Sequence, residues 1–71
     1  MNKAQQQLAA WVDDELSRGR TRGDCADRLG ITRGTLWRWL GDKGKPNLDQ
    51  AIDVEETIGI RATAWKEEIE A

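Results

Sequence analysis

The stretch Arg22–Gly41, with the sequence RGDCADRLGITRGTLWRWLG, decides the fold expected for this chain of 71 residues. Two short helices that cross steeply need a small residue where their backbones approach, and Ala26 fills that position. The tight turn between such helices needs a residue that tolerates a positive φ, and Gly30 follows four residues later. We therefore predict consecutive helices over residues 22–29 and 33–40.

The apolar side chains of this stretch fall on one side of the two predicted helices. Leu29, Ile31, Leu36 and Trp39 are expected to face the core, while the polar residues occupy the opposite face. Cys25 takes an inward position, and we expect it to behave as a small buried hydrophobe.

Local signals on either side predict three further helices, over residues 3–18, 48–58 and 62–70. An Asn-x-x-Gln capping pattern starts the first at Asn2 and the second at Asn47. The last segment is expected to be amphipathic. Outside the central stretch, the residues expected on buried helix faces are Leu8, Trp11, Val12, Leu16, Leu48, Ala51, Ile52 and Ile58.

No segment shows the alternation of a strand, and no repeat is present. We therefore predict one compact all-α domain of five helices over residues 1–71. A domain this small buries a limited core, and its stability is expected to be marginal. The first residues contain no apolar leader and no segment has the length of a membrane span, so a cytoplasmic location is expected.

Composition excludes several classes of function. The chain has one cysteine and no histidine, so neither an internal disulfide nor a Cys/His zinc site nor a histidine-dependent catalytic triad is available. We expect no cofactor, no metal and no enzymatic activity. The formal net charge is −2, but residues 18–45 carry +5 and the remainder carries −7. A basic middle of this kind can present one face to phosphate groups.

With these residues in view, the chain resembles the lambda-repressor-like helix-turn-helix family, which includes Cro-type and XRE-type phage and prophage regulators. The resemblance runs from Thr21 to Trp65. It rests on Ala26, Leu29-Gly30-Ile31, Thr35-Leu36, Arg38-Trp39, Gly44-Lys45-Pro46-Asn47-Leu48, Ile58-Gly59-Ile60 and Trp65. It implies a five-helix DNA-binding domain whose third helix enters the major groove, usually as a two-fold dimer.

Two features depart from the family pattern. Arg22 and Gly23 stand at the start of the second helix, where the family often has a glutamine that touches phosphate and braces the third helix. Gly34 and Trp37 occupy positions of the third helix that are usually polar.

The resemblance assigns roles along the third helix and its flanks. Thr32, Arg33, Gly34 and Trp37 are the expected base contacts; an arginine in the first turn suits bidentate contact with guanine, and Thr32 is also the expected N-cap. Trp37 either packs on thymine methyl groups and sugar or contacts the domain or a partner. The expected phosphate contacts are Arg20, Arg22, Arg38, Lys43 and Lys45.

The function that follows is a sequence-specific transcriptional regulator, a repressor that occludes a promoter as a homodimer on double-stranded operator DNA, with no small-molecule ligand. Ile60, Trp65 and Ile69 are the expected dimer interface, because the last amphipathic helix has no further chain to cover it. Two alternatives remain: a protein-interaction module, of partner-binding or anti-repressor type, that keeps the scaffold without binding DNA, and a DNA-binding antitoxin or accessory regulator.

Overall fold

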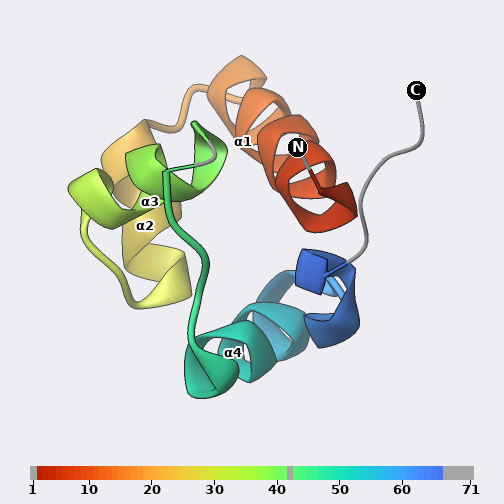
Figure 1. Cartoon of the computed structure of the whole chain (residues 1–71). Helices are drawn as coiled ribbons and strands as arrows, with labels where there is room; N and C mark the ends of the chain where they lie inside the picture. Colours follow the sequence, from red (N-terminus) through yellow and green to blue (C-terminus); the bar gives the residue numbers. More distant parts are fainter. Residues whose placement is uncertain (1, 42, 67–71) are drawn as a thin grey trace.

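The computed structural model describes residues 2–41 and 43–66 of the chain. Four α-helices and one short 3-10 helix make up this part: α1 (Lys3–Ser17), α2 (Arg22–Leu29), α3 (Arg33–Leu40), α4 (Leu48–Ile58) and η1 (Ala62–Lys66). Figure 1 shows α1 lying across one side of the molecule, α2 and α3 packed beside one another, and α4 with η1 closing the other side. The prediction of an all-α domain is confirmed.

The helix boundaries follow from the capping residues. Asn2, Thr21 and Asn47 each form a complete capping box with the residue three positions later, and this box satisfies amides that a helix leaves unpaired. Gly30 and Gly59 adopt the left-handed conformation that ends α2 and α4. The four α-helices therefore coincide with their predicted ranges to within one residue.

The fifth predicted helix, residues 62–70, is corrected by the structure. Its described part is a five-residue 3-10 helix over Ala62–Lys66, and residues 67–70 lie outside the described part of the chain. Tight winding brings consecutive side chains Ala64 and Trp65 into the core. The Trp65 ring meets Trp39 edge-on at 5.6 Å between centroids. Residues 62–66 therefore pack into the core and do not form the amphipathic surface helix that was predicted.

The core contains most of the residues that the central stretch predicts, and Ile31 is only partly buried against it. Cys25, Ala26, Leu29, Leu36 and Trp39 are all buried. Burial raises the pKa of the Cys25 thiol, and the nearby carboxylates of α1 and α2 raise it further. The thiol is accordingly held in its neutral form, as expected for a buried hydrophobe.

The prediction for α4 is partly wrong. Leu48 and Ile52, expected to be buried, are exposed at 72% and 42%, whereas Val54 is fully buried. The inward stripe of α4 runs through Ala51, Val54 and the partly buried Ile58. Ile52 lies about 100° around the helix from Ala51, since an α-helix turns 3.6 residues per turn, and so it leaves the core side.

Two buried side-chain amides connect the start of α1 to η1 and to the last turn of α3. Asn2 Nδ2 donates a hydrogen bond to the Trp65 carbonyl at 2.9 Å, and Gln5 Nε2 donates to the Trp39 carbonyl at 3.1 Å. These carbonyls belong to η1 and to the last turn of α3, where helical partners run out. The capping box of α1 therefore also positions α3.

We predict that Asn2→Ala destabilises the protein by about 2–3 kcal/mol, because it removes an N-cap and leaves a buried carbonyl without its donor. The matched control is Asn47→Ala, which removes an exposed capping box of the same type and should cost about 1 kcal/mol. Urea unfolding followed by tryptophan fluorescence measures both. Equal losses in the two variants would show that the bond from Asn2 to Trp65 contributes nothing.

Candidate nucleic-acid interface

One side of α3 is built of exposed side chains that have no function in the core. Leu36 and Trp39 point inward and are buried, and helical spacing places Arg33, Gly34, Trp37 and Arg38 toward solvent. Trp37 is 66% exposed, although it is the largest side chain type in the chain. The eight residues of α3 contain two arginines and no acid. This surface is therefore positively charged and partly aromatic.

The first turn of α3 is fixed by Thr32. Its hydroxyl oxygen accepts a hydrogen bond from the Thr35 amide at 3.1 Å, and the two threonine hydroxyls are 3.0 Å apart. The predicted N-cap is confirmed. Because the hydroxyl is already engaged in the cap, Thr32 contributes chiefly by setting where Arg33 begins the helix.

Gly23 determines how the Arg33 side chain lies. A Cβ atom built at Gly23 would be 3.3 Å from Arg33 Cδ, which is closer than most Cβ contacts in proteins. The absence of a side chain on α2 therefore lets the aliphatic part of Arg33 rest against that helix. Sequence reasoning noted Gly23 only as a departure from the family pattern and missed this packing.

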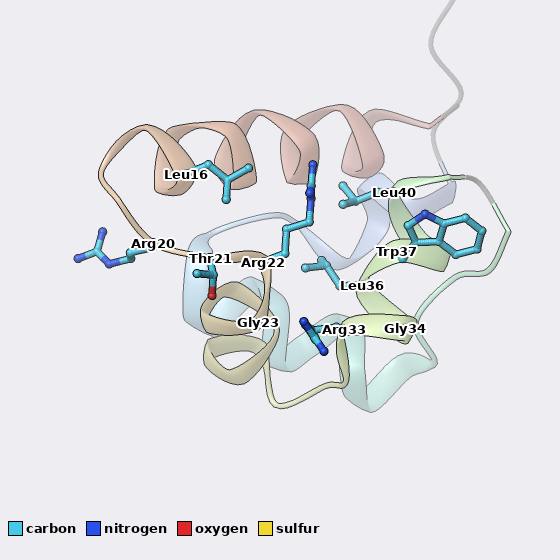
Figure 2. A pocket seen from close by; sticks show the side chains of 10 residues that line it. All are labelled: Leu16, Arg20, Thr21, Arg22, Gly23, Arg33, Gly34, Leu36, Trp37 and Leu40. Atoms are coloured by element: carbon cyan, nitrogen blue, oxygen red, sulfur yellow. The ribbon is translucent and has the colours of Figure 1, made fainter.

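A hollow of about 610 Å³ opens between the end of α1, the start of α2 and the outer side of α3. Figure 2 shows Arg22 and Arg33 extending from α2 and α3, with Leu16 and Leu40 on either side of the Arg22 side chain and Trp37 at the edge of the hollow. No ion pair or side-chain hydrogen bond engages Arg22, Arg33 or Arg38 among the described residues. The residues lining the hollow are Leu16, Arg20, Thr21, Arg22, Gly23, Arg33, Gly34, Leu36, Trp37 and Leu40.

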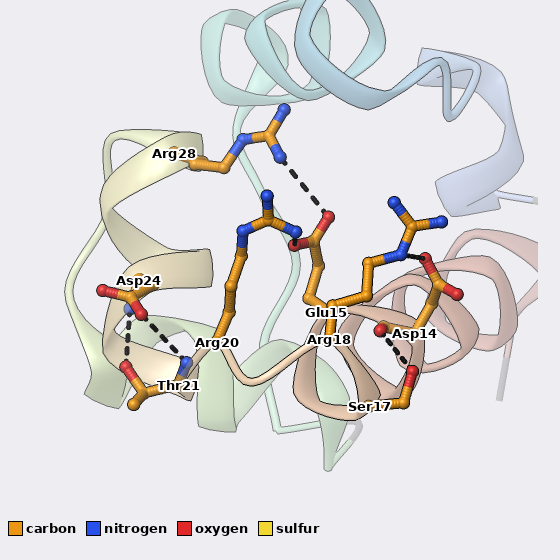
Figure 3. Close-up of polar contacts among 8 residues, drawn as sticks. All are labelled: Asp14, Glu15, Ser17, Arg18, Arg20, Thr21, Asp24 and Arg28. Atoms are coloured by element: carbon orange, nitrogen blue, oxygen red, sulfur yellow. Dashed lines mark hydrogen bonds and ion pairs between the residues drawn. The ribbon is translucent and has the colours of Figure 1, made fainter.

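Arg20 has a different environment from Arg22. Its Nη1 lies 2.6 Å from Glu15 Oε2, and Arg28 Nη1 lies 3.3 Å from the other oxygen of the same carboxylate, as Figure 3 shows. Glu15 is 95% buried, and the Arg28 guanidinium also lies 5.8 Å over the Trp11 ring. The Arg20 guanidinium is thus already engaged in an ion pair with Glu15.

The burial of Glu15 was missed in the sequence. The signal was available, since Glu15 follows Leu8 and Val12 at spacings of seven and three and so lies on the inward face of α1. A buried carboxylate needs charged or hydrogen-bonding partners, and the two basic residues at positions 20 and 28 supply them.

The loop after α3 carries the last two predicted phosphate contacts. Lys43 and Lys45 are both exposed, and the Lys43 amide donates to the Arg38 carbonyl at 2.8 Å. Gly44 passes close to the Arg38 Cβ and the Trp39 ring, so the loop folds back against α3. Lys43 is therefore held near the C-terminal end of that helix, whereas Lys45 borders a hollow beside α4 and η1.

The residues predicted at a dimer interface do not form an exposed group. Ile60 and Trp65 are buried within a single chain, and Ile69 lies outside the described residues. The expectation that this segment leaves apolar area uncovered is wrong for Ile60 and Trp65, because η1 packs against α1 and α4. The side chains of Ile60 and Trp65 are therefore not available on the surface of a single chain.

Comparison with protein-family models, with curated proteins and with solved structures yielded no match to this chain. None of the helices in the described part is both long and apolar enough to cross a membrane. Residues 2–41 and 43–66 contain no cluster of three or more side chains suited to hold a metal ion.

We predict that Arg20→Ala lowers the free energy of unfolding by about 1 kcal/mol, because it removes one of two cations from a buried carboxylate while solvent still reaches part of the site. Arg22→Ala, two residues away and without a partner in the described chain, should change stability by less than about 0.5 kcal/mol. Thermal or urea unfolding of both variants checks the contrast. A loss from Arg22→Ala as large as that from Arg20→Ala would contradict the assignment of these two arginines.

Proposed function

We propose that this protein is a sequence-specific DNA-binding regulator that places α3 in the major groove, and that it represses transcription by occupying a promoter. The observation that carries the proposal is the outer side of α3, where Arg33, Gly34, Trp37 and Arg38 are all exposed and the arginines have no partner among the described residues. A helix that exposes unpaired arginines from a rigid scaffold is suited to read base edges. The sequence resemblance of residues 21–65 to the lambda-repressor-like helix-turn-helix family agrees with this proposal.

Within this proposal, Arg33 makes the principal base contact. Its aliphatic part rests against Gly23, which limits the directions in which the guanidinium extends. Bidentate hydrogen bonds from arginine to guanine O6 and N7 are worth about 1–3 kcal/mol of discrimination. Gly34 leaves room for close approach of the helix, and Trp37 contacts thymine methyl groups or sugar one turn later.

Phosphate groups on either side of the groove are contacted by basic residues that flank α3. Arg22 lies at the start of α2, where the helix dipole also favours an anion. Arg38 lies in the last turn of α3, and Lys43 and Lys45 lie in the loop that follows it. Arg20 contributes less, because its guanidinium is shared with Glu15. Four phosphate contacts therefore belong to each protomer in this proposal.

The size of the molecule is compatible with a two-fold dimer on DNA. The extents of the chain are 32 × 27 × 21 Å. Half-sites read by paired helices lie about 34 Å apart along the duplex. Two copies side by side can thus present two α3 helices to successive major grooves without a linker.

The alternative of a protein-interaction module is favoured by one observation, the 66% exposure of Trp37. Tryptophan and arginine are enriched among the residues that dominate protein interfaces. Such a module would leave Arg22, Lys43 and Lys45 without a role, whereas DNA binding uses them all. The two functions differ in whether binding depends on a duplex.

We expect that a random-sequence duplex pool, carried through rounds of selection on the protein, converges on one motif. Arg33→Ala should weaken binding to that motif about 5- to 150-fold, the equivalent of 1–3 kcal/mol, and relax sequence preference at one position. Arg61→Ala is the matched control, since Arg61 is exposed outside the proposed interface. Fluorescence anisotropy with labelled duplexes measures both variants.

Raising the salt concentration from about 50 to 200 mM should weaken binding about 100-fold for each protomer that makes four phosphate contacts. Arg22→Ala should reduce this dependence without changing the selected motif. A pool that never converges, together with a salt-independent signal, would exclude DNA as the partner and leave the protein-interaction module.

A further inference from the structure

The large apolar side chains exposed within residues 2–41 and 43–66 are Trp37, Leu48 and Ile52. They occur on two surfaces of opposite dominant charge, although Leu48 also borders a hollow that Lys45 and Lys66 line. Trp37 lies with arginines on α3, and Leu48 and Ile52 lie with carboxylates on α4. Apolar groups surrounded by opposite charges on two surfaces are the components of a complementary interface.

The first surface is the hollow of about 610 Å³ described above, which we call the basic hollow. Arg22, Arg33 and Trp37 line it, and Leu16 and Leu40 supply apolar area on either side of the Arg22 side chain, as Figure 2 shows. Its volume falls within the range of about 300–1,000 Å³ typical of clefts that bind ligands. A phosphate would use the arginines of this hollow but not its leucines.

The second surface is the outer side of α4, which we call the acidic face. Leu48 and Ile52 form one row at a spacing of four, and Asp49 and Asp53 form the adjacent row. All four are exposed, and the two carboxylates form no ion pair with any described residue. The eleven residues of α4 include no lysine or arginine. The face is therefore apolar and negatively charged.

We propose that the acidic face of one copy docks into the basic hollow of a second copy, head to tail. Leu48 and Ile52 then cover Leu16, Leu40 and Trp37, while Asp49 and Asp53 meet Arg22 and Arg33. The occupant is a second copy because the complementary charges belong to one chain, in which residues 18–45 carry +5 and the remainder carries −7. This contact is distinct from the two-fold dimer proposed on DNA.

A head-to-tail contact leaves one basic hollow and one acidic face free at the ends, so it forms short open chains unless the rotation closes a ring. The patch on so small a protein is limited in area, and transient contacts of this kind are weak and sensitive to salt. Docking covers Arg33 and Trp37, so associated protein cannot read DNA. That regulatory consequence rests on the proposed function; the association itself does not.

The test is a pair of charge reversals studied alone and mixed. Arg22→Glu/Arg33→Glu makes the hollow acidic, and Asp49→Lys/Asp53→Lys makes the face basic. In either variant alone the two surfaces repel, so each should sediment as a monomer under conditions where the natural protein associates. Mixed in equal amounts, the two variants should associate again, because each then meets a surface of opposite charge.

Sedimentation velocity at about 50 mM and 500 mM salt measures association, which should be lost at the higher concentration because charges are screened there. Asp13→Lys/Arg61→Glu is the control, since it reverses one exposed charge of each sign outside both surfaces and should associate like the natural protein. Circular dichroism and urea unfolding establish that each variant folds. Leu48→Ser/Ile52→Ser removes only apolar contacts and should lose association while keeping its affinity for the selected duplex.

A natural protein that stays monomeric at all concentrations would overturn the proposal. It would also be overturned by charge-reversed variants that associate alone, or by a mixture that remains monomeric. Failure of the proposed function is distinguishable, because it would appear as loss of duplex binding by the natural protein while the mixed variants still associate.

Discussion

Burial of Leu36 and Trp39 on the inner side of α3 is the constraint on which the rest of the structure depends. A helix has one rotational phase, so once these two residues enter the core, Arg33, Trp37 and Arg38 have to face solvent. Trp39 is held from two sides, by the Trp65 ring and by the hydrogen bond from Gln5 to its carbonyl. Contacts from α1 and η1 therefore help to determine which side chains α3 exposes to solvent.

The fold was predictable where local rules decide the outcome. Asn2, Thr21, Thr32 and Asn47 are side chains that cap helices almost irrespective of context, and Gly30 adopts a conformation that other residues avoid. These positions explain why the starts of four helices and the end of α2 could be predicted from the sequence.

The predictions that were wrong depend on contacts between distant parts of the chain. Leu48 is apolar and begins a helix, yet it is 72% exposed in the described part of the chain, and the sequence carries no sign of that exposure. The 3-10 winding of η1 depends on how Trp65 reaches Trp39, which is a contact between distant residues. Glu15 could have been placed from its spacing alone, but the general rarity of buried carboxylates argues against such a reading.

The candidate site brings together residues that the sequence identified only one at a time. Arg33 and Trp37 were expected on one helix, but the support of Arg33 by Gly23 and the hollow shared with α1 appear only in three dimensions. Arg20 and Arg22 looked equivalent in the sequence, and the structure separates them because only Arg20 reaches Glu15. The basic surface is consequently smaller than the charge count suggests, and it is centred on α3.

The central claim is that DNA contacts the outer side of α3, and the four tryptophans of the chain allow it to be tested directly. In a nitrogen-15 NMR titration, each indole N–H is a separate reporter: Trp37 on the proposed interface, Trp11 on α1, and Trp39 and Trp65 in the core. Addition of the selected duplex should shift the Trp37 indole resonance most, with Trp39 and Trp65 nearly unchanged. A duplex that binds while the Trp37 resonance stays in place would contradict the account, because α3 would then not face the DNA.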